Sequence, residues 1–245
     1  MKTMSKKQGS TKQKSLSAGK ARRLERKSTT WTIAFRPATH SKKLSIPLGF
    51  AVRNLLEASK NMKETKFILT NNKVTVDGIV RKSRNFSLGL FDLLELKDLK
   101  KTFRIVLDTN GRLALHEIKA GEKPFKLCKI ASKKAVKQGS ILLSTNDGRS
   151  FLEKQTGLKP GDSVKIQIPE QKIMKELKLE AGSIVLLLSG KHVGRTAKVA
   201  EIIQGTLRKE KTLTLEMNGE QFQTTANNVF VIGSEKPEIE VLKED

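Results

Sequence analysis

The loop at residues 190–195 combines glycines with cations and is the first candidate for a phosphate-binding site in this chain. Glycines let backbone N–H groups close around an anion, and a lysine supplies positive charge. The spacing does not fit a nucleotide-binding P-loop, which would require a glycine where Val185 stands and a Ser or Thr where His192 stands. The loop therefore needs another explanation.

Side chains that could act as nucleophiles, bases or metal ligands are few and scattered. His40, His116 and His192 fall in separate segments, and Cys128 is the only cysteine. The alternation in "FKLCKI" predicts that Cys128 is a buried strand residue. Neither zinc spacing nor a nucleophile–base pair is visible. We therefore expect no catalytic residue, no metal and no cofactor.

The charge balance points to a polyanionic partner. The 245 residues include 48 Lys and Arg against 25 Asp and Glu, a net charge of +23. The longest apolar run, Ile184 to Leu188, is far shorter than the roughly 20 residues of a membrane-spanning helix. A single cysteine and the lack of an apolar leader favour a location in a reducing, intracellular compartment. A basic mitochondrial presequence stays open as an alternative.

About half of the excess charge lies in a basic N-terminal arm, residues 1–43. The arm holds 13 Lys and Arg and one acid, Glu25, a net charge of +12. With few apolar residues to bury, the arm is expected to be disordered alone and to order against something negative. A solvated tail is the alternative. Trp31, beside Phe35 and Arg36, is expected to pack on the next domain or to stack on a nucleobase, packing being favoured.

Residues 45–96 are expected to form a small unit of two helices followed by a hairpin. Apolar spacing predicts helices in "IPLGFAVRNLLEAS" and "NMKETKFILTNN", the second ending at Asn71 and Asn72. Asp77-Gly78 fits a two-residue type I′ turn. Six basic residues are placed around this unit. Lys60, Lys63 and Lys66 are expected on one helix face, and Lys73, Arg81 and Lys82 on the hairpin.

The segment "KETKFILTNNKVTVDG" resembles the alpha-L RNA-binding motif, in which a basic helix and a glycine precede a "V-x-V-[ND]-G" hairpin. Ribosomal proteins, pseudouridine synthases and tyrosyl-tRNA synthetases share this motif. Asn72 occupies the glycine position, where asparagine is the next-best left-handed residue. By position, the resemblance implies RNA contacts at Lys63, Lys66 and Lys73. It does not imply an enzyme, because the rest of the chain offers no separate catalytic domain.

Beyond residue 100 the pattern predicts short strands joined by tight turns. Asn110-Gly111, Asp147-Gly148 and Asn218-Gly219 each lie between apolar-alternating runs and predict hairpins. Val164, Ile166 and Ile168 form a period-2 stripe after a Pro160-Gly161 turn. We expect a helix-like turn or linker at 170–179, and hence a domain boundary there. Two small barrels fit the remaining length.

"GKHVGRTAKVAEI" resembles the KOW motif, a loop and strand pair of an SH3-like barrel found in ribosomal proteins and transcription elongation factors. The resemblance implies that Lys191, Arg195 and Lys198 project toward RNA or a protein partner, while the glycines permit positive φ. The alternative is that Gly190 and Gly194 only shape the turn. Ala197 stands at the place of a third glycine and would be strained if that position required positive φ.

The order of these parts is more specific than any single one. A basic arm, "SIPL" before an alpha-L unit, "FKLCKI", a KOW loop and "VFVIGSEKPEI" together resemble the family of small-subunit ribosomal protein "four" of archaeal and eukaryotic type, from about Lys20 to Ile239. The family implies a structural, non-enzymatic role in the cytoplasm, on the small ribosomal subunit. Its partners would be small-subunit ribosomal RNA and neighbouring ribosomal proteins, with no membrane and no small-molecule substrate.

The expected fold is α+β and mostly β. The expected domains are a basic arm (1–43), an alpha-L RNA-binding domain (44–100), a central β domain (101–172), a KOW SH3-like barrel (173–236) and a C-terminal tail (237–245). The candidate RNA-binding residues are Arg22, Arg23, Arg26, Lys27, Arg36, Lys60, Lys63, Lys66, Lys73, Arg81, Lys82, Lys191, Arg195 and Lys198. The alternative function is a KOW-containing transcription or translation factor that docks on polymerase or ribosome. A transient factor would have little use for so basic an arm.

Overall fold

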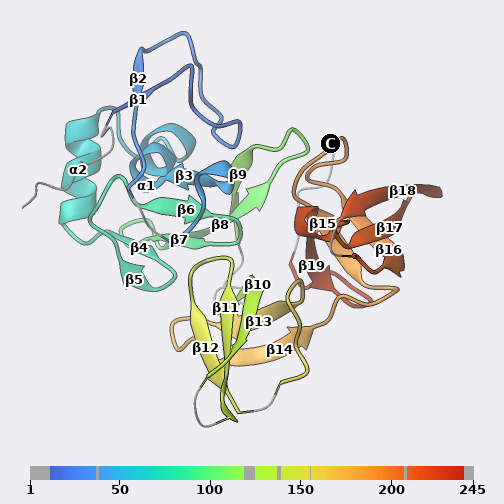
Figure 1. Ribbon diagram of the computed structural model, residues 1–245. Coiled ribbons are helices and arrows are strands. Elements are labelled where there is room, and N and C mark those ends of the chain that lie inside the picture. The colour runs from blue at the N-terminus through green and yellow to red at the C-terminus, as the bar shows by residue number, and fades with distance from the viewer. Residues whose placement is uncertain are drawn as a thin grey trace, which may run out of the picture.

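The computed structural model describes residues 12–36, 39–118, 125–136, 139–154, 156–206 and 209–239, and it is mostly β. Three five-stranded antiparallel sheets make up the body, and the described helices are short and lie before residue 71, apart from a 3-10 turn at Ala226–Asn228. Figure 1 shows the first sheet with its helices, the second sheet below it and the third sheet beside it. The expectation of a mainly β, α+β fold is confirmed.

The first sheet has the order β5-β4-β7-β8-β9 and carries the helical part of the chain. Its strands are β4 (Val74–Val76), β5 (Ile79–Val80), β7 (Leu93–Leu96), β8 (Lys101–Leu107) and β9 (Leu113–Glu117). The helical segments are a 3-10 turn (Lys42–Leu44), α1 (Leu48–Phe50), a π-helical turn (Ala51–Leu55) and α2 (Met62–Thr70). A small ladder of β3 (Ser45–Pro47) and β6 (Ser87–Gly89) completes this part.

Asparagine residues mark both ends of helix α2. The side chain of Asn61 accepts hydrogen bonds from the backbone N–H groups of Lys63 (3.0 Å) and Glu64 (3.1 Å), which would otherwise lack partners at the first turn. At the other end, Asn72 has φ of 59°, the left-handed conformation predicted for it. The predicted hairpin follows, with Asp77 and Gly78 both at positive φ and Val76 paired with Ile79.

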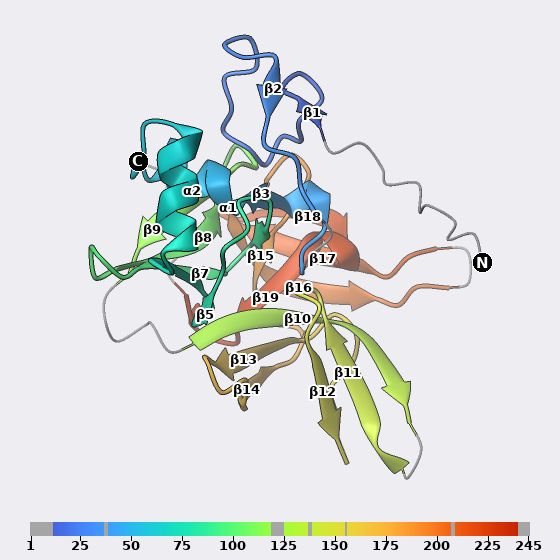
Figure 2. The same cartoon turned by 90° about the vertical axis from the view of Figure 1, so that its left-hand side faces the viewer.

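The second sheet has the order β12-β11-β10-β13-β14. Its strands are β10 (Phe125–Ala135), β11 (Ile141–Thr145), β12 (Ser150–Glu153), β13 (Ser163–Gln167) and β14 (Ile173–Leu177). The long strand β10 pairs with β13 through its first half and with β11 through its second (Figure 2). Cys128 is fully buried, as predicted, in a core with Val164 and Ile166.

The expected turn or linker at 170–179 is wrong. Residues 173–177 form β14, which pairs antiparallel with β13. The strand lacks a clear alternation of apolar and polar residues because it lies at the edge of the sheet. Met174, Lys175 and Glu176 are exposed, and Leu177 is buried. An edge strand covered on one face needs few apolar residues, so the strand pattern is weak.

The third sheet has the order β18-β17-β16-β15-β19. Its strands are β15 (Ile184–Leu187), β16 (Thr196–Ile203), β17 (Thr212–Met217), β18 (Glu220–Thr225) and β19 (Val229–Gly233). The predicted two-residue turn at Asn218-Gly219 is present, with both residues at positive φ and Met217 paired with Glu220. Asn110-Gly111 and Asp147-Gly148 also lie in hairpins, but within longer loops that close at Leu107↔Leu113 and Ser144↔Ser150.

Two of the expected domain boundaries, at 100 and at 172, separate strands that the structure pairs in one sheet. Strands β8 and β9 are placed in the central domain by the boundary at 100, but β8 pairs with β7 of the first sheet and β9 pairs with β8. Strand β14, placed in the last domain by the boundary at 172, belongs to the second sheet. We therefore propose that the division between domains follows the sheets, with boundaries at 118–125 and 177–184.

One apolar core joins the first and third sheets. It contains Leu94 and Ile105 from the first sheet together with Val185 and Phe230 from the third. The rings of Phe91 and Phe230 meet edge to face, with their centroids 5.1 Å apart. The second sheet has an additional core of its own. The first and third sheets are therefore fixed to each other by packing.

The arm, as far as it is described, lies against the first sheet. Residues 12–36 contain the two-stranded ladder of β1 (Gln13–Lys14) and β2 (Trp31–Thr32). Ala18 and Ala21 are buried, and the carbonyl oxygen of Ala21 accepts a hydrogen bond from the N–H of Leu113 (2.9 Å). The expectation that the arm is disordered alone is wrong for these residues, because they find protein partners. Residues 1–11 lie outside the described part.

Candidate nucleic-acid interface

Helix α2 presents the clearest cationic face. Lys63 and Lys66 are exposed along it, as expected from their spacing. Lys60 is exposed too, but it precedes the helix cap Asn61, and its backbone N–H donates to the carboxylate of Glu64 (2.8 Å). The prediction that all three lysines share one helix face is wrong, because the helix begins two residues after Lys60.

Phe67 is the residue on this face that sequence reasoning missed. Its side chain is 63% exposed, next to Lys66 and one helical turn after Lys63. In the sequence, "KFIL" reads as the start of an apolar stripe, so Phe67 looks like a core residue. The structure buries Leu69 instead and leaves the phenyl ring of Phe67 exposed to solvent. Such a ring can stack on an unpaired base while the lysines meet phosphates.

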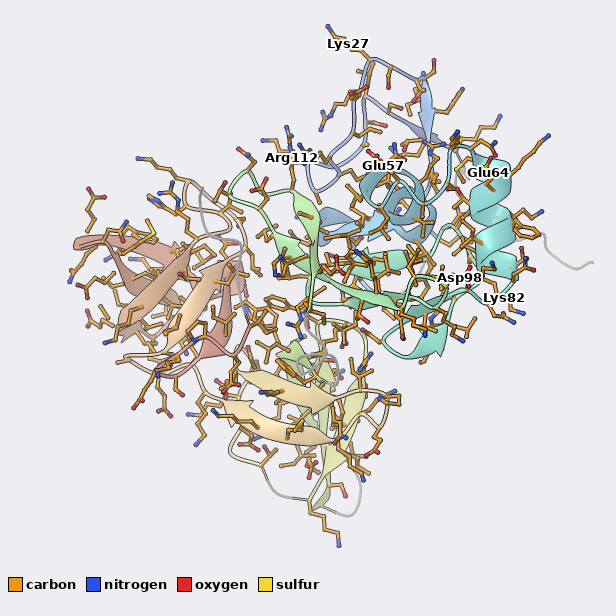
Figure 3. All side chains as sticks on the ribbon, turned by 180° about the vertical axis from the view of Figure 1, so that it is seen from behind. Lys27, Glu57, Glu64, Lys82, Asp98 and Arg112 are labelled. Carbon is orange, nitrogen blue, oxygen red and sulfur yellow. The ribbon has the colours of Figure 1, made fainter. Side chains whose placement is uncertain are left out.

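The hairpin contributes one well-exposed cation and two that are engaged by protein. Lys82 is exposed, and in the view of Figure 3 it lies on the same side of the molecule as Asp98 and the C-terminal end of α2. Lys73 Nζ lies 2.6 Å from Asp98 Oδ2, a surface pair that an RNA phosphate would have to displace. The guanidinium of Arg81 lies over the ring of Phe86, 4.5 Å from its centroid.

Within the arm, Arg22 is not available for RNA. It is buried, its Nη1 donates to the carbonyl oxygen of Ile33 (2.9 Å), and it stacks over Phe35 at 4.3 Å. Burial lowers the pKa of this guanidinium to about 10. The prediction of an RNA contact at Arg22 is corrected: its side chain instead joins the segment around Arg22 to the segment around Ile33 and Phe35 within the arm.

The other candidate cations of the arm are on its surface. Arg23, Lys27 and Arg36 are exposed, and Lys27 stands at the outer tip of the arm in Figure 3. Arg26 is exposed as well, although its Nη2 donates to the carbonyl oxygen of Ala18 (3.2 Å). These four stay candidates for phosphate contact.

The loop 190–195 has a structural reason for its glycines. Gly194 is buried with φ of 78°, and a Cβ there would collide with the backbone of Asp108 in the β8–β9 loop. His192 stacks against Phe222, with ring centroids 4.6 Å apart. The loop therefore packs the third sheet against the β8–β9 loop of the first sheet. Its conformation does not require an anion.

The cations of this loop still face outward. Lys191, Arg195 and Lys198 are all exposed. The strands β15 and β16, which flank this loop, lie on the opposite side of Figure 1 from α2, so the structure does not bring the two groups of candidate cations together. Ala197 is a buried strand residue paired with Val185 and is not among the residues at positive φ. The strain considered for this alanine does not arise.

A buried ionic cluster, also missed by sequence reasoning, joins the first and second sheets. Lys126 Nζ lies 2.9 Å from Asp77, 2.5 Å from Asp92 and 3.0 Å from Asp147. Arg149 bridges Asp77 (2.7 Å) and Asp147 (3.1 Å). A buried lysine is tolerated only with such compensation. Three carboxylates surround Lys126, so the cluster orients one sheet on the other.

The cluster shifts the protonation of its members. Burial opposes ionisation of Asp147, but the charge of Lys126 and the hydrogen bond from Thr145 outweigh it and lower the pKa of this carboxyl to about 2. The pKa of Asp92 is lowered against burial by Lys126 and by His40, whose Nε2 lies 2.9 Å away. Burial raises the pKa of Asp77, and burial raises that of the Cys128 thiol. Cys128 is thus a neutral core residue.

The remaining chemistry of the described residues is sparse. Across the described ranges, no group of three or more His, Cys, Asp or Glu side chains is arranged to hold a metal ion. None of the helices described is long and apolar enough to span a bilayer. The described part of the chain is thus a β protein of three sheets with many exposed cations.

Comparison with known proteins places the chain in a family. A sequence profile described as "Ribosomal family S4e" matches residues 99–173. Small ribosomal subunit protein eS4 of Methanosphaera stadtmanae is 36% identical over 219 residues, covering 89% of this chain and 90% of that protein. The eS4 protein of Methanocaldococcus jannaschii is 37% identical over 227 residues, covering 89% and 92%.

A solved structure agrees. The crystal structure of 30S ribosomal protein S4e from Thermoplasma acidophilum superposes with a TM-score of 0.68 at 29% identity, covering 78% of this chain and 96% of that one. The chain belongs to the ribosomal protein S4e family. The resemblance stated from the sequence is thereby confirmed.

Proposed function

We propose that this protein is a structural constituent of the small ribosomal subunit that binds small-subunit ribosomal RNA and has no catalytic role. Family membership carries the proposal, since its eS4 relatives are named as small-subunit proteins. It locates the protein in the cytoplasm on that subunit, with ribosomal RNA and neighbouring ribosomal proteins as partners. These relatives favour a resident subunit protein over a factor that docks on polymerase or ribosome.

We propose α2 and the nearby surface of the arm as the principal RNA contact. Lys63, Lys66 and Phe67 are exposed together on α2, and Lys82 extends this cationic surface at the end of the helix. Phosphate contacts from such lysines fix a protein on RNA, while an exposed ring can take up an unpaired base. Lys191, Arg195 and Lys198 form a second candidate surface toward RNA or a neighbouring protein.

The test is salt-dependent binding of the full chain to small-subunit ribosomal RNA. If on the order of six to ten phosphates are neutralised, affinity should fall by roughly 10³- to 10⁵-fold between about 50 and 200 mM salt, by analogy with duplex DNA. The double variant Lys63→Glu with Lys66→Glu should weaken RNA binding. It should still fold, because a glutamate near the N-terminus of a helix stabilises the helix.

The matched control is Lys134→Glu with Lys154→Glu, which makes the same charge change at two exposed positions, one on β10 and one directly after β12. Figure 2 shows that β12 and the end of β10 lie at the opposite end of the molecule from the arm. The control should bind much more tightly than the α2 variant. Equal losses would mean that only net charge matters, and a flat salt response would refute the phosphate-dominated interface.

A further inference from the structure

A pocket of about 430 Å³ lies between the arm and the helical part of the first domain, and it is distinct from the cationic face of α2 described above. The arm supplies Lys12 and the ring of Trp31 from β2. The π-helical turn supplies Arg53, helix α2 supplies Met62 at its first position, and the segment before β6 supplies Arg84 and Asn85. A volume of this size is in the range of small-ligand pockets.

Trp31 is the unusual feature of this pocket. The ring is 53% exposed, although its backbone is fixed by pairing with Lys14 in the β1–β2 ladder. An aromatic side chain of this size is normally covered in a folded protein. The expectation that Trp31 packs on the next domain is met only in part: the residue shares a pocket with Arg53 and Met62 of that domain, and about half of it is exposed.

The charge around the ring selects the class of ligand. The cations Lys12, Arg53 and Arg84 line the pocket, and among the residues that the structure describes none of those lining it is acidic. Lys12 Nζ lies 5.8 Å from the Trp31 ring centroid, so positive charge lies beside the stacking surface. An aromatic wall with cations around it matches a base attached to phosphates.

The state of the base follows from RNA geometry. Bases inside an A-form helix are stacked and paired, so only a nucleotide from a loop, bulge or single strand can enter a pocket base first. We propose that this pocket binds one unpaired nucleobase of RNA, stacked on Trp31, with its flanking phosphates held by Lys12, Arg53 and Arg84. This inference rests on the proposed function, since it gives the bound RNA a specific anchoring nucleotide.

Trp31 is the sole tryptophan of the chain, so its fluorescence reports directly on the pocket. The full chain would be titrated with a fluorescein-labelled single-stranded hexaribonucleotide, and with the same hexamer made abasic, each taken to saturation by anisotropy. Stacking predicts strong quenching of Trp31 by the base-bearing strand. The abasic strand should leave the emission nearly unchanged at equal saturation.

Affinity for small-subunit ribosomal RNA gives the second readout. Trp31→Ala should weaken binding by about 5- to 100-fold, as expected for the loss of one stacked base. Trp31→Phe should keep most of the affinity because a stacking ring remains. The control Leu152→Ala removes a side chain that is 63% exposed on β12 and should change binding less than about twofold. Circular dichroism verifies that each variant is folded.

The outcomes separate this inference from the proposed function. If the wild-type chain binds ribosomal RNA but both hexamers leave Trp31 unquenched and Trp31→Ala binds normally, the pocket inference is overturned and the proposed function stands. If Trp31→Ala binds ribosomal RNA normally but is lost from small subunits, the pocket holds a protein side chain, which also overturns it. If the wild-type chain does not bind the RNA at all, the proposed function itself fails.

Discussion

Lys126 Nζ on β10 lies 2.9 Å from Asp77 Oδ2 in the turn between β4 and β5, and both side chains are buried. The contact joins two residues 49 positions apart and two different sheets. Since Asp77 also occupies the type I′ turn that follows α2, the same residue shapes the hairpin and docks it on the second sheet. The position of the candidate RNA surface is thus linked to the buried cluster.

Removing the central cation should be strongly destabilising. Lys126→Met leaves Asp77, Asp92 and Asp147 without their shared counter-ion, and breaking a buried pair in this way costs about 3–5 kcal/mol of unfolding free energy. Urea unfolding provides the measurement. Lys101→Met is the control, because the pair of Lys101 with Glu117 is half exposed and should contribute less than about 1 kcal/mol. Equal effects of the two changes would contradict the account.

The buried cluster also determines how the free energy of unfolding changes at acidic pH. The pKa of Asp147 is about 2 in the folded protein against 3.8 ordinarily, so its ionised form stabilises the fold above about pH 4. That contribution should disappear as pH falls from about 4 to 2. Asp92, with a lowered pKa, adds to the effect, and Asp77, with a raised pKa, opposes it.

The measurement is the slope of unfolding free energy against pH in this window. Asp147→Asn carries no titrating carboxyl, so its stability should fall less steeply than that of the wild-type chain between about pH 4 and 2. Parallel curves would show that Asp147 titrates normally in the folded protein.

Gly194 offers a test of the role assigned to the loop at 190–195. Gly194→Ala should destabilise the fold by at least about 1 kcal/mol, because alanine is disfavoured at positive φ and its Cβ would collide with Asp108. Gly157→Ala is the matched control, since it has no positive φ and no atom within 4 Å of a Cβ. Thermal unfolding should separate the two variants, and an unchanged melting temperature for Gly194→Ala would refute the packing role.

Phe67 tests the stacking role of the α2 face. Since its ring is 63% exposed, Phe67→Ala should change the unfolding free energy by no more than about 0.5 kcal/mol. Its affinity for ribosomal RNA should fall by about 1–3 kcal/mol, the range for one stacked base. Binding is measured by filter retention, with Leu152→Ala as the equally exposed control. A variant that unfolds easily yet binds normally would show that Phe67 is a packing residue.

Local features could be predicted from the sequence because neighbouring residues determine them. The turns at Asp77-Gly78 and Asn218-Gly219 need only two residues that accept positive φ, and both are present as predicted. Asn72 adopts the left-handed conformation expected of it. The buried position of Cys128 follows from strand alternation.

Features that depend on distant residues could not be predicted in this way. Lys126 reads as an ordinary basic residue in "FKLCKI", and its burial follows from acids 49, 34 and 21 positions away. Arg22 looked like an RNA ligand because the sequence gives no sign that the backbone carbonyl oxygen of Ile33 accepts a hydrogen bond from its guanidinium. Trp31 was expected to pack on the next domain and Phe67 was not singled out, since aromatic type alone gives no sign of exposure.

The most direct test of the central claim is lysine acetylation footprinting of the protein free and in purified small ribosomal subunits. Peptide mass spectrometry would measure the labelling rate of Lys27, Lys63, Lys66 and Lys82, all exposed in the structure of the isolated chain. The account predicts that these lysines are protected in the subunit and become reactive again after ribonuclease digestion of the RNA. Equal labelling in the free and assembled states, or protection that persists after the RNA is removed, would contradict it.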